Sequence, residues 1–380
     1  MRLHLAFGLL SIFFTCTRVF AEERYSGFTG LSCQEVLSAT PQRFEGDIKE
    51  LRFLSYNTAD IFEEVKKIHL ELSKTPRRHL SREDQKNFEE KTLKLKEQIR
   101  IISESNSDVI LLTEISSLEG LDAGLPSEIK IKYRPYFFKT NDIRQRSMTI
   151  LVKNDLPWEL KITSRHEQKW FDPVTRQQAP LFSRNFPQIE FFRTSLHGQA
   201  EEPPLFVFFG NHAKSQRSRE GDARSETWRT AQYKEIHRIV KDFESRGVAV
   251  FLAGDFNVAL DDEETTRELS GLSRTLVGSL SLYPDEDRRW THSYHQLVRE
   301  AQNASREFEL PPQYNRLDEI MISPRLIRDV LLADVPLYQD ANGHPITERP
   351  RTYQERNETQ PSDHRPVFLI ISTNILFRKS

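Results

Sequence analysis

The chain has 380 residues, of which 37% are hydrophobic and 29% charged, and its formal net charge is −2. This composition is that of an ordinary globular protein with enough apolar residues for a large core, and no internal repeat or low-complexity stretch interrupts it. The near-neutral charge excludes a protein that binds polyanions by bulk charge. Any nucleic-acid binding therefore needs a local basic patch or metal ions.

The first 21 residues have the layout of a secretory signal peptide. Arg2 precedes an apolar run over residues 5–14, and a cleavage site follows at Ala21. The run is shorter than the roughly 20 residues that span a bilayer, and no later segment is long and apolar enough to do so. We therefore expect a secreted or periplasmic monomer without a transmembrane segment in the mature chain. Its sole cysteine would be Cys33, which rules out an internal disulfide and a thiolate zinc site.

Two short apolar runs in the N-terminal half end in polar residues. LRFLSYN ends in Asn57, and DVILLTE ends in Glu114. Apolar runs of four to eight residues bounded by turn formers are typical of strands buried on both faces. Between them, the charged segment Glu63–Asp84 is expected to be a surface elaboration, and apolar residues at helical spacing predict a helix over Lys86–Ser103.

The middle of the chain repeats this arrangement. PLFVFFGNH is a third apolar run, and it ends in Asn211 and His212. A helix is predicted over Ser225–Arg246, with Ser225 as its N-cap. Strands that alternate with helices favour an architecture in which layers of helices cover sheets.

The fourth run, VAVFLAGDFN, ends in Asp255 and Asn257. Continued strand alternation would place these two side chains on one side of the chain and Phe256 on the other. Gly254 would allow a close approach of the backbone at this point. The following segment, Ala259–Arg289, is expected to be a second surface elaboration.

Two runs near the C-terminus reverse the pattern. Asp318 precedes the apolar part of RLDEIMIS, and Asp363 and His364 precede that of SDHRPVFLIIS. If these two strands run antiparallel to the first four, all six polar ends meet at the same edge of the sheets. Loops at such an edge usually carry the functional side chains.

These polar ends would gather carboxylates, amides and imidazoles at one place. They are Glu114, Asp255, Asp318, Asp363, Asn57, Asn211, Asn257, His212 and His364. Two like unit charges 4 Å apart repel by about 4 kcal/mol at an effective dielectric constant near 20, so converging carboxylates need a cation. Oxygen ligands without thiolates favour Mg²⁺, with Mn²⁺ or Ca²⁺ as alternatives, over zinc. The residues alone thus indicate metal-assisted hydrolysis of a phosphoester.

The same motifs carry a resemblance to a known family. LSYN, LLTE, GNHAKS, GDFN, RLDEIMIS and SDHRPV, in this order, resemble the endonuclease/exonuclease/phosphatase superfamily over Leu51–Ile371, and most of all its secreted bacterial nucleases. The resemblance implies the fold of pancreatic deoxyribonuclease, an α/β four-layer sandwich of two mixed β-sheets flanked by helices. We accordingly divide the chain into a signal peptide at 1–21, an N-terminal extension at 22–48, a catalytic domain at 49–373 and a tail at 374–380.

The resemblance also implies roles for the acids and amides. Glu114 would be the main metal ligand, and Asn57 would hold metal or phosphate beside it. Asp255 would orient or deprotonate the attacking water, and Asn257 would bind the phosphate and stabilise the transition state. Asp363 would serve the metal or the leaving group.

The histidines would act on the phosphate. His364 would contact the scissile phosphate while Asp318 fixes its tautomer, as in catalytic triads. His212 would be a second phosphate contact or proton donor, with Asn211 as its phosphate-binding neighbour. Arg184 in FSRNFP is similar to an arginine that lies near the phosphate in relatives.

One position departs from the family pattern. Some nucleases have an acid two residues after the first asparagine, where this chain has Ala59 followed by Asp60. A second metal ligand at this point is therefore not assigned.

Three functions stay open from the sequence. The first is a nuclease on DNA or RNA, and the second is a phosphatase or a phospholipase-type phosphodiesterase that acts on phospholipid or on a small phosphoester. Exposed aromatic residues at Trp170 and Phe171, which are expected in a hairpin, would favour the second. The third is a catalytically silent binding module, against which none of the expected metal, base and histidine positions is missing.

Overall fold

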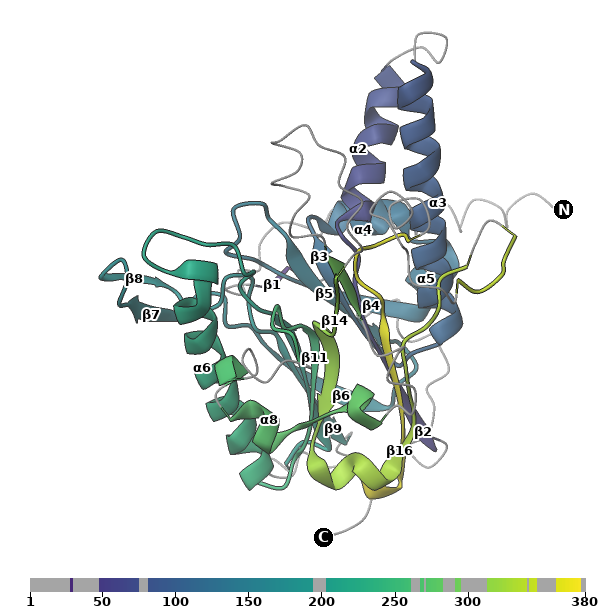
Figure 1. Cartoon of the computed structure of the whole chain (residues 1–380). Coiled ribbons are helices and arrows are strands. Elements are labelled where there is room, and N and C mark those ends of the chain that lie inside the picture. Colours follow the sequence, from purple (N-terminus) through teal and green to yellow (C-terminus); the bar gives the residue numbers. More distant parts are fainter. Residues whose placement is uncertain are drawn as a thin grey trace, which may run out of the picture.

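Two mixed β-sheets packed face to face form the centre of the protein (Figure 1). The first has the strand order β1 (Phe28–Thr29), β4 (Tyr133–Phe138), β5 (Ser147–Lys153), β3 (Val109–Ile115), β2 (Glu50–Asn57), β17 (Val367–Ser372) and β16 (Val330–Asp334). The second has the order β12 (Val277–Gly278), β15 (Asp318–Ile322), β11 (Ala249–Asp255), β10 (Phe206–His212), β9 (Gln188–Arg193) and β6 (Trp158–Thr163). Two further sheets have two strands each: β7 (Lys169–Asp172) with β8 (Gln177–Pro180), and β13 (His292–Tyr294) with β14 (Gln313–Asn315).

The structure is a computed structural model that describes most of the chain after residue 47. The described residues are 28–29, 48–74, 81–193, 203–260, 267–269, 271–282, 291–294, 313–339, 342–346 and 360–376. The predicted signal peptide, nearly all of the N-terminal extension and Cys33 lie outside them. Among the described helices, none has the length and apolar character that a membrane span requires.

The strand directions confirm the arrangement predicted from the apolar runs. β2 is parallel to β3, and β10 is parallel to β11. β17 is antiparallel to β2, and β15 is antiparallel to β11. The ends of β2, β3, β10 and β11 and the beginnings of β15 and β17 therefore lie at the same edge of their sheets.

Aromatic side chains fill the space between the two sheets. The ring of Phe53 in β2 stacks on that of Phe251 in β11, with centroids 4.4 Å apart, and lies 5.9 Å from that of Phe208 in β10. Every residue of β3, β10 and β11 is buried. Because both faces of these strands are covered, their sequences are apolar up to the polar residues near their ends instead of alternating.

Helices cover the outer faces of the sheets, which confirms the predicted four-layer sandwich (Figure 1). Helix α6 (Glu226–Ser245) packs on the second sheet through residues that include Tyr233, Ile236 and Val240. The first sheet is covered by α2 (Ile61–Lys74), α3 (Arg82–Ser105), α4 (Leu118–Gly124) and α5 (Ser127–Lys132). Shorter helices are α8 (Leu272–Thr275) and the 3₁₀ turns η4 (Ala223–Ser225), η5 (Arg267–Leu269), η6 (Ser279–Leu282), η8 (Pro324–Asp329) and η9 (Thr373–Ile375).

The two segments expected to be surface elaborations differ from each other. Helices α2 and α3 project from the sheet as a pair, although the base of α2 buries Ile61, Phe62 and Val65 (Figure 1). For Ala259–Arg289 the expectation was wrong, since its described part belongs to the core. Leucines three or four residues apart, Leu269, Leu272, Leu276 and Leu280, are all buried, and β12 pairs with β15.

The predicted cap of α6 was also wrong in its chemistry. Ser225 does precede the helix, but its backbone is left-handed, with φ 52°, and its hydroxyl donates to the carbonyl of Arg217. The carboxylate of Asp222 accepts from the backbone N–H groups of Thr227 and Trp228, at 3.0 and 3.4 Å. Asp222 therefore satisfies the free donors at the start of the helix.

Candidate active site

Side chains from both sheets meet where the predicted strand ends lie. The amide of Asn57, at the end of β2, is 3.4 Å from the carboxylate of Asp255 at the end of β11. The imidazole of His364, just before β17, binds Asp318 at the start of β15. The site is therefore built across the gap between the sheets, and the central core holds its two halves in place.

Asp255 and Asn257 are placed by a tight turn. β11 ends at Asp255, Asn257 has φ 51°, and its backbone N–H donates to Asp255 Oδ1 at 2.8 Å. The two side chains are thus neighbours because of this turn and not because of strand alternation, so the predicted reason was wrong. Gly254 has φ 135°, and a Cβ there would lie 1.8 Å from the carbonyl oxygen of Asn211. The predicted close approach at Gly254 is confirmed.

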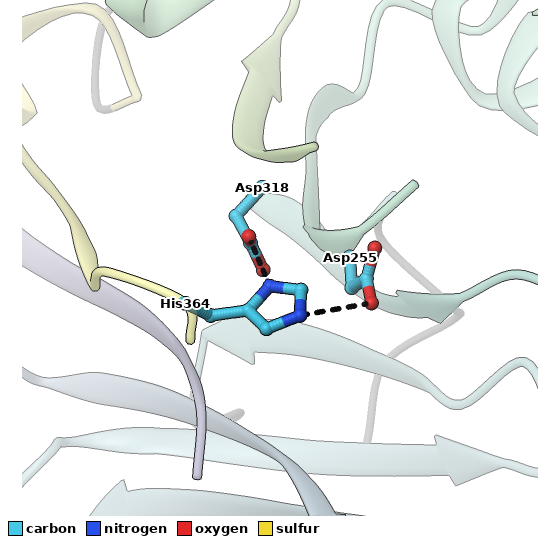
Figure 2. A group of neighbouring side chains, drawn as sticks. All are labelled: Asp255, Asp318 and His364. Atoms are coloured by element: carbon cyan, nitrogen blue, oxygen red, sulfur yellow. Dashed lines mark hydrogen bonds and ion pairs between the residues drawn. The ribbon is translucent and has the colours of Figure 1, made fainter. Parts of the chain in front are cut away.

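A buried Asp–His–Asp cluster lies at the centre of the site (Figure 2). His364 Nδ1 is 2.6 Å from Asp318 Oδ2, and His364 Nε2 is 4.0 Å from Asp255 Oδ2. Burial opposes the charge of His364, but the carboxylates of Asp318 and Asp255 outweigh it and hold the pKa of His364 well above its usual value. Burial raises the pKa of Asp255 to about 7, with a smaller contribution from Asp318 and against the effect of His364.

His212 is a second imidazole near Asp255. Its Nε2 is 3.5 Å from Asp255 Oδ2 and 3.8 Å from Glu114 Oε1, and its side chain is 1% exposed. Burial, with the neighbouring guanidinium of Arg184, lowers the pKa of His212 well below its usual value. Two histidines whose pKa values are shifted in opposite directions thus lie near the same carboxylate oxygen, Asp255 Oδ2.

Glu114 is presented by an irregularity in β3. The pairing of β3 with β5 shifts between Thr113 and Ile115, and Glu114 has φ 59°. A residue other than glycine adopts this conformation at a cost of roughly 1–2 kcal/mol, and such strain is often found at functional sites. The bulge directs the Glu114 carboxylate to the edge of the sheet, where it binds Arg146 at 2.5 Å.

The remaining predicted residues have other contacts. The amide of Asn211 donates to the carbonyl of Asp255 at 3.2 Å, and Arg184 Nη1 donates to the carbonyl of Ala213 at 2.6 Å. Asp363 is half-buried and lines a cavity of about 210 Å³ beside the site. Both carboxylate oxygens of Asp60 are bonded to Ser116, so the structure gives no support for a metal ligand there.

Sequence reasoning missed several residues of the site. Arg146, which binds Glu114, follows Arg144 in the segment RQR directly before β5. Because β5 is antiparallel to β3, its beginning lies at the same edge as the end of β3, and this position was a usable signal. Ser362 had no such signal: its hydroxyl donates to the carbonyl of Asn57 at 2.9 Å and accepts from the N–H of His364 at 3.1 Å.

Comparisons with known proteins agree with this arrangement. The model of the endonuclease/exonuclease/phosphatase family matches residues 81–364, and β2 with Asn57, which precedes the matched range, pairs directly with β3 inside it. A search among curated proteins gives no match.

Several solved structures are similar to this chain at low sequence identity. Truncated TDP2 from Caenorhabditis elegans is 17% identical over 86% of this chain and 100% of that chain, with a TM-score of 0.50. An endonuclease/exonuclease/phosphatase family protein of Bacteroides thetaiotaomicron is 14% identical over 85% of this chain and 97% of that chain, with a TM-score of 0.48. A mannosyl-6-phosphatase of the same organism is 14% identical over 84% and 99%, also at 0.48.

The family match covers more than half of the chain, and the two sheets with their outer helices are those of a solved structure with the same fold. The chain belongs to the endonuclease/exonuclease/phosphatase family, whose enzymes hydrolyse phosphoester bonds.

Proposed function

We propose that this protein is a divalent-metal-dependent phosphodiesterase that cleaves DNA or RNA. The observation that carries the proposal is the buried pair of His364 and Asp318 near Asp255, with Glu114 3.8 Å from His212. A carboxylate with a pKa near 7 beside a charged imidazole supplies both a base for water and a donor for phosphate.

The donor atoms near Glu114 fit a hard cation. Glu114 and Asn57 offer oxygens, the carboxylate of Glu114 already binds the cationic Arg146, and the described part of the site contains no thiolate. We assign Glu114 and Asn57 as the residues that would hold Mg²⁺, with Mn²⁺ or Ca²⁺ as alternatives, and Asp363 as a further candidate. When bound, the ion would act as a Lewis acid on the phosphoryl oxygens.

The protein residues then have distinct tasks. Asp255 accepts the proton of the attacking water, since its pKa lets it exchange a proton near neutral pH. The bond from Nδ1 to Asp318 orients His364, and its Nε2, 4.0 Å from Asp255 Oδ2, would donate to the phosphate. Asn257 binds the carbonyl of Ala213 through one amide hydrogen and has a second for a phosphoryl oxygen.

A polyanionic substrate is favoured by basic side chains beside the site. Arg144, Arg146, Arg184 and Lys214 all come from strands and loops at this edge, although the whole chain has a net charge of −2. Local cationic groups of this kind are the feature that the neutral composition required for nucleic-acid binding. We therefore place a nuclease ahead of a monoester phosphatase.

A phospholipid substrate is the second candidate, and one observation favours it. The predicted hairpin around Trp170 and Phe171 is confirmed as β7 and β8, and Phe171 is 57% exposed. Trp170, in contrast, is partly buried against the core under α6. A single exposed aromatic residue at a hairpin is a weaker argument than the basic side chains at the site.

We also propose that the protein is exported, on the basis of the signal-peptide layout of residues 1–21. Expression of the full chain in a bacterial host should give extracellular or periplasmic protein whose N-terminal sequence begins at residue 22. Recovery of uncleaved protein solely from the cytoplasm would contradict export.

Metal removal and a substrate panel test the catalytic proposal together. Purified mature protein with Mg²⁺ is expected to cleave plasmid DNA or RNA faster than sphingomyelin or inositol phosphates. EDTA should abolish the activity, and Mg²⁺ or Mn²⁺ should restore it, because the oxygen atoms of Glu114 and Asn57 favour hard divalent cations. Full activity in the presence of EDTA would overturn the metal assignment. Faster cleavage of a lipid than of DNA or RNA would contradict the nuclease proposal and favour the phospholipid substrate.

A further inference from the structure

Side chains from helix α6 bind both the backbone N–H and the carbonyl of Lys214. Its N–H donates to Gln232 Oε1 at 2.9 Å, and its carbonyl accepts from Arg229 Nη1 at 3.3 Å. The carbonyl of the preceding Ala213 accepts from both Arg184 and Asn257, at 2.6 and 3.1 Å. The position of Lys214 is therefore tied to that of Asn257, a residue of the proposed phosphate site.

The side chains that hold Lys214 are themselves fixed. Arg229 and Gln232 project from α6, are 0% and 2% exposed, and lie under the loop that carries Lys214. The guanidinium of Arg229 binds Glu268 through Nε at 2.6 Å and Nη2 at 2.9 Å. Two buried polar side chains thus bind the backbone of one short loop. An exposed lysine without a function would not need its backbone fixed in this way.

The ammonium group of Lys214 lacks a carboxylate partner among the described residues. Its Nζ lies 3.4 Å from the hydroxyl and 3.5 Å from the carbonyl of Ser215, and 5.9 Å from the centroid of the Trp228 ring. Trp228 is fixed by a bond from Nε1 to the carbonyl of Leu181 at 2.7 Å. The charge is therefore positioned by aromatic and backbone groups and not neutralised by an acid.

The charges around Lys214 are mainly positive. Burial, together with Arg184 and Arg144, lowers the pKa of Lys214 to about 8. Asp142 acts in the opposite direction, but its carboxylate is already bonded to Arg144 at 2.8 Å and lies 3.3 Å from Arg184. A half-buried cation next to two arginines that share one carboxylate is a favourable place for an anion.

We propose that Lys214 binds a second phosphate of the substrate, next to the phosphate held by Asn257 and His364. The proposal rests on the proposed function and specifies its substrate class: a chain in which phosphates follow one another, as in an oligonucleotide. A compound with one phosphate would fill the reacting site alone. A nucleotide with phosphates at both the 3′ and 5′ positions would also reach Lys214.

A binding measurement tests this site without turnover. In an Asp255→Asn background, thymidine 3′,5′-bisphosphate is expected to bind about tenfold more tightly than thymidine 5′-monophosphate in calorimetry with Mg²⁺. Lys214→Met keeps the aliphatic stem on Trp228 and removes the charge, so it should abolish this preference, and Lys214→Arg should restore most of it. Lys161→Met, an exposed lysine of β6, is the matched control and should leave the preference unchanged.

Two outcomes would overturn the assignment. One is equal binding of the two nucleotides by the Lys214-containing protein, and the other is a full bisphosphate preference in Lys214→Met. A measurement of activity distinguishes the second phosphate site from the nuclease proposal. Lys214→Met should reduce the slope of log(kcat/KM) against log[salt] for an oligonucleotide by about 1. Absence of oligonucleotide cleavage by the wild type, with the bisphosphate preference intact, would refute the nuclease and retain the second phosphate site.

Discussion

Asp255→Asn is expected to lower kcat by at least about 100-fold while the protein stays folded, because the substitution removes a general base and keeps the shape of the side chain. The amide oxygen of asparagine can still accept the bond that Asp255 Oδ1 receives from the N–H of Asn257. Burial raises the pKa of Asp255 to about 7, which means that the folded state disfavours its charge. The neutral variant should therefore unfold at the same temperature as the wild type or higher.

Asp108→Asn is a control with the opposite expected profile. Asp108 is equally buried but lies at the far end of the strands, where it binds Lys153 Nζ at 3.0 Å and the N–H of Arg52 at 2.9 Å. Loss of its charge leaves the buried Lys153 without its carboxylate partner, although Nζ still donates to the carbonyl of Asn106 at 2.7 Å, so this variant should lose stability and keep its kcat. Measurement of kcat and of urea unfolding on both variants distinguishes the two profiles, and near-normal turnover in Asp255→Asn would remove Asp255 from the mechanism.

The convergence of the site could be predicted because it depends on features that are local in sequence. An apolar run such as that of β11 predicts a strand, and the polar residues after it predict where the strand reaches the edge of its sheet. The parallel and antiparallel pairings of six runs then bring Asn57, Asp255 and His364 together. Beyond the order of the runs, the prediction needed one assumption, that the last two strands run antiparallel to the first four.

The contacts inside the site could not be predicted in the same way. Asn257 lies beside Asp255 because of a left-handed residue after the strand, and a repeating pattern of strand residues contains no such turn. The bond between Arg146 and Glu114 joins residues 32 positions apart, and it depends on a bulge in β3. Such contacts depend on backbone irregularities, which a regular strand pattern does not contain, and on pairing between strands, which is non-local.

The misassigned segment Ala259–Arg289 shows a different limit. Its many charged residues suggested a surface segment, but Leu272 and Leu276 pack in the core between α6 and the second sheet, and Leu280 packs in the core between the two sheets. A short helix exposes polar residues on one side and buries apolar ones on the other. The average polarity of such a segment therefore does not show that part of it is buried in the core. Spacing of the leucines was the better signal.

Gly254→Ala is expected to destabilise the protein by roughly 3–5 kcal/mol, the sum of an unfavourable backbone conformation and a steric overlap. Gly254 has φ 135°, and the new Cβ would lie 1.8 Å from the carbonyl oxygen of Asn211 in the neighbouring strand. The overlap is with backbone in the middle of a sheet, so β10 and β11 would have to separate. His212 and Asp255 are paired in the next register position, and their 3.5 Å contact would be lost with it.

Gly247→Ala separates the two causes. Gly247 also has a positive φ, 73°, but its Cβ would meet nothing closer than Arg325 Nη1 at 3.8 Å. It should therefore cost only the conformational part, about 1–2 kcal/mol, with kcat unchanged. Similar free energies of unfolding for the two variants would contradict the close approach at Gly254. A larger loss in Gly254→Ala, accompanied by a fall in kcat, would mean that the glycine at the end of β11 is required because it lets two strands approach closely enough to bring His212 and Asp255 into contact.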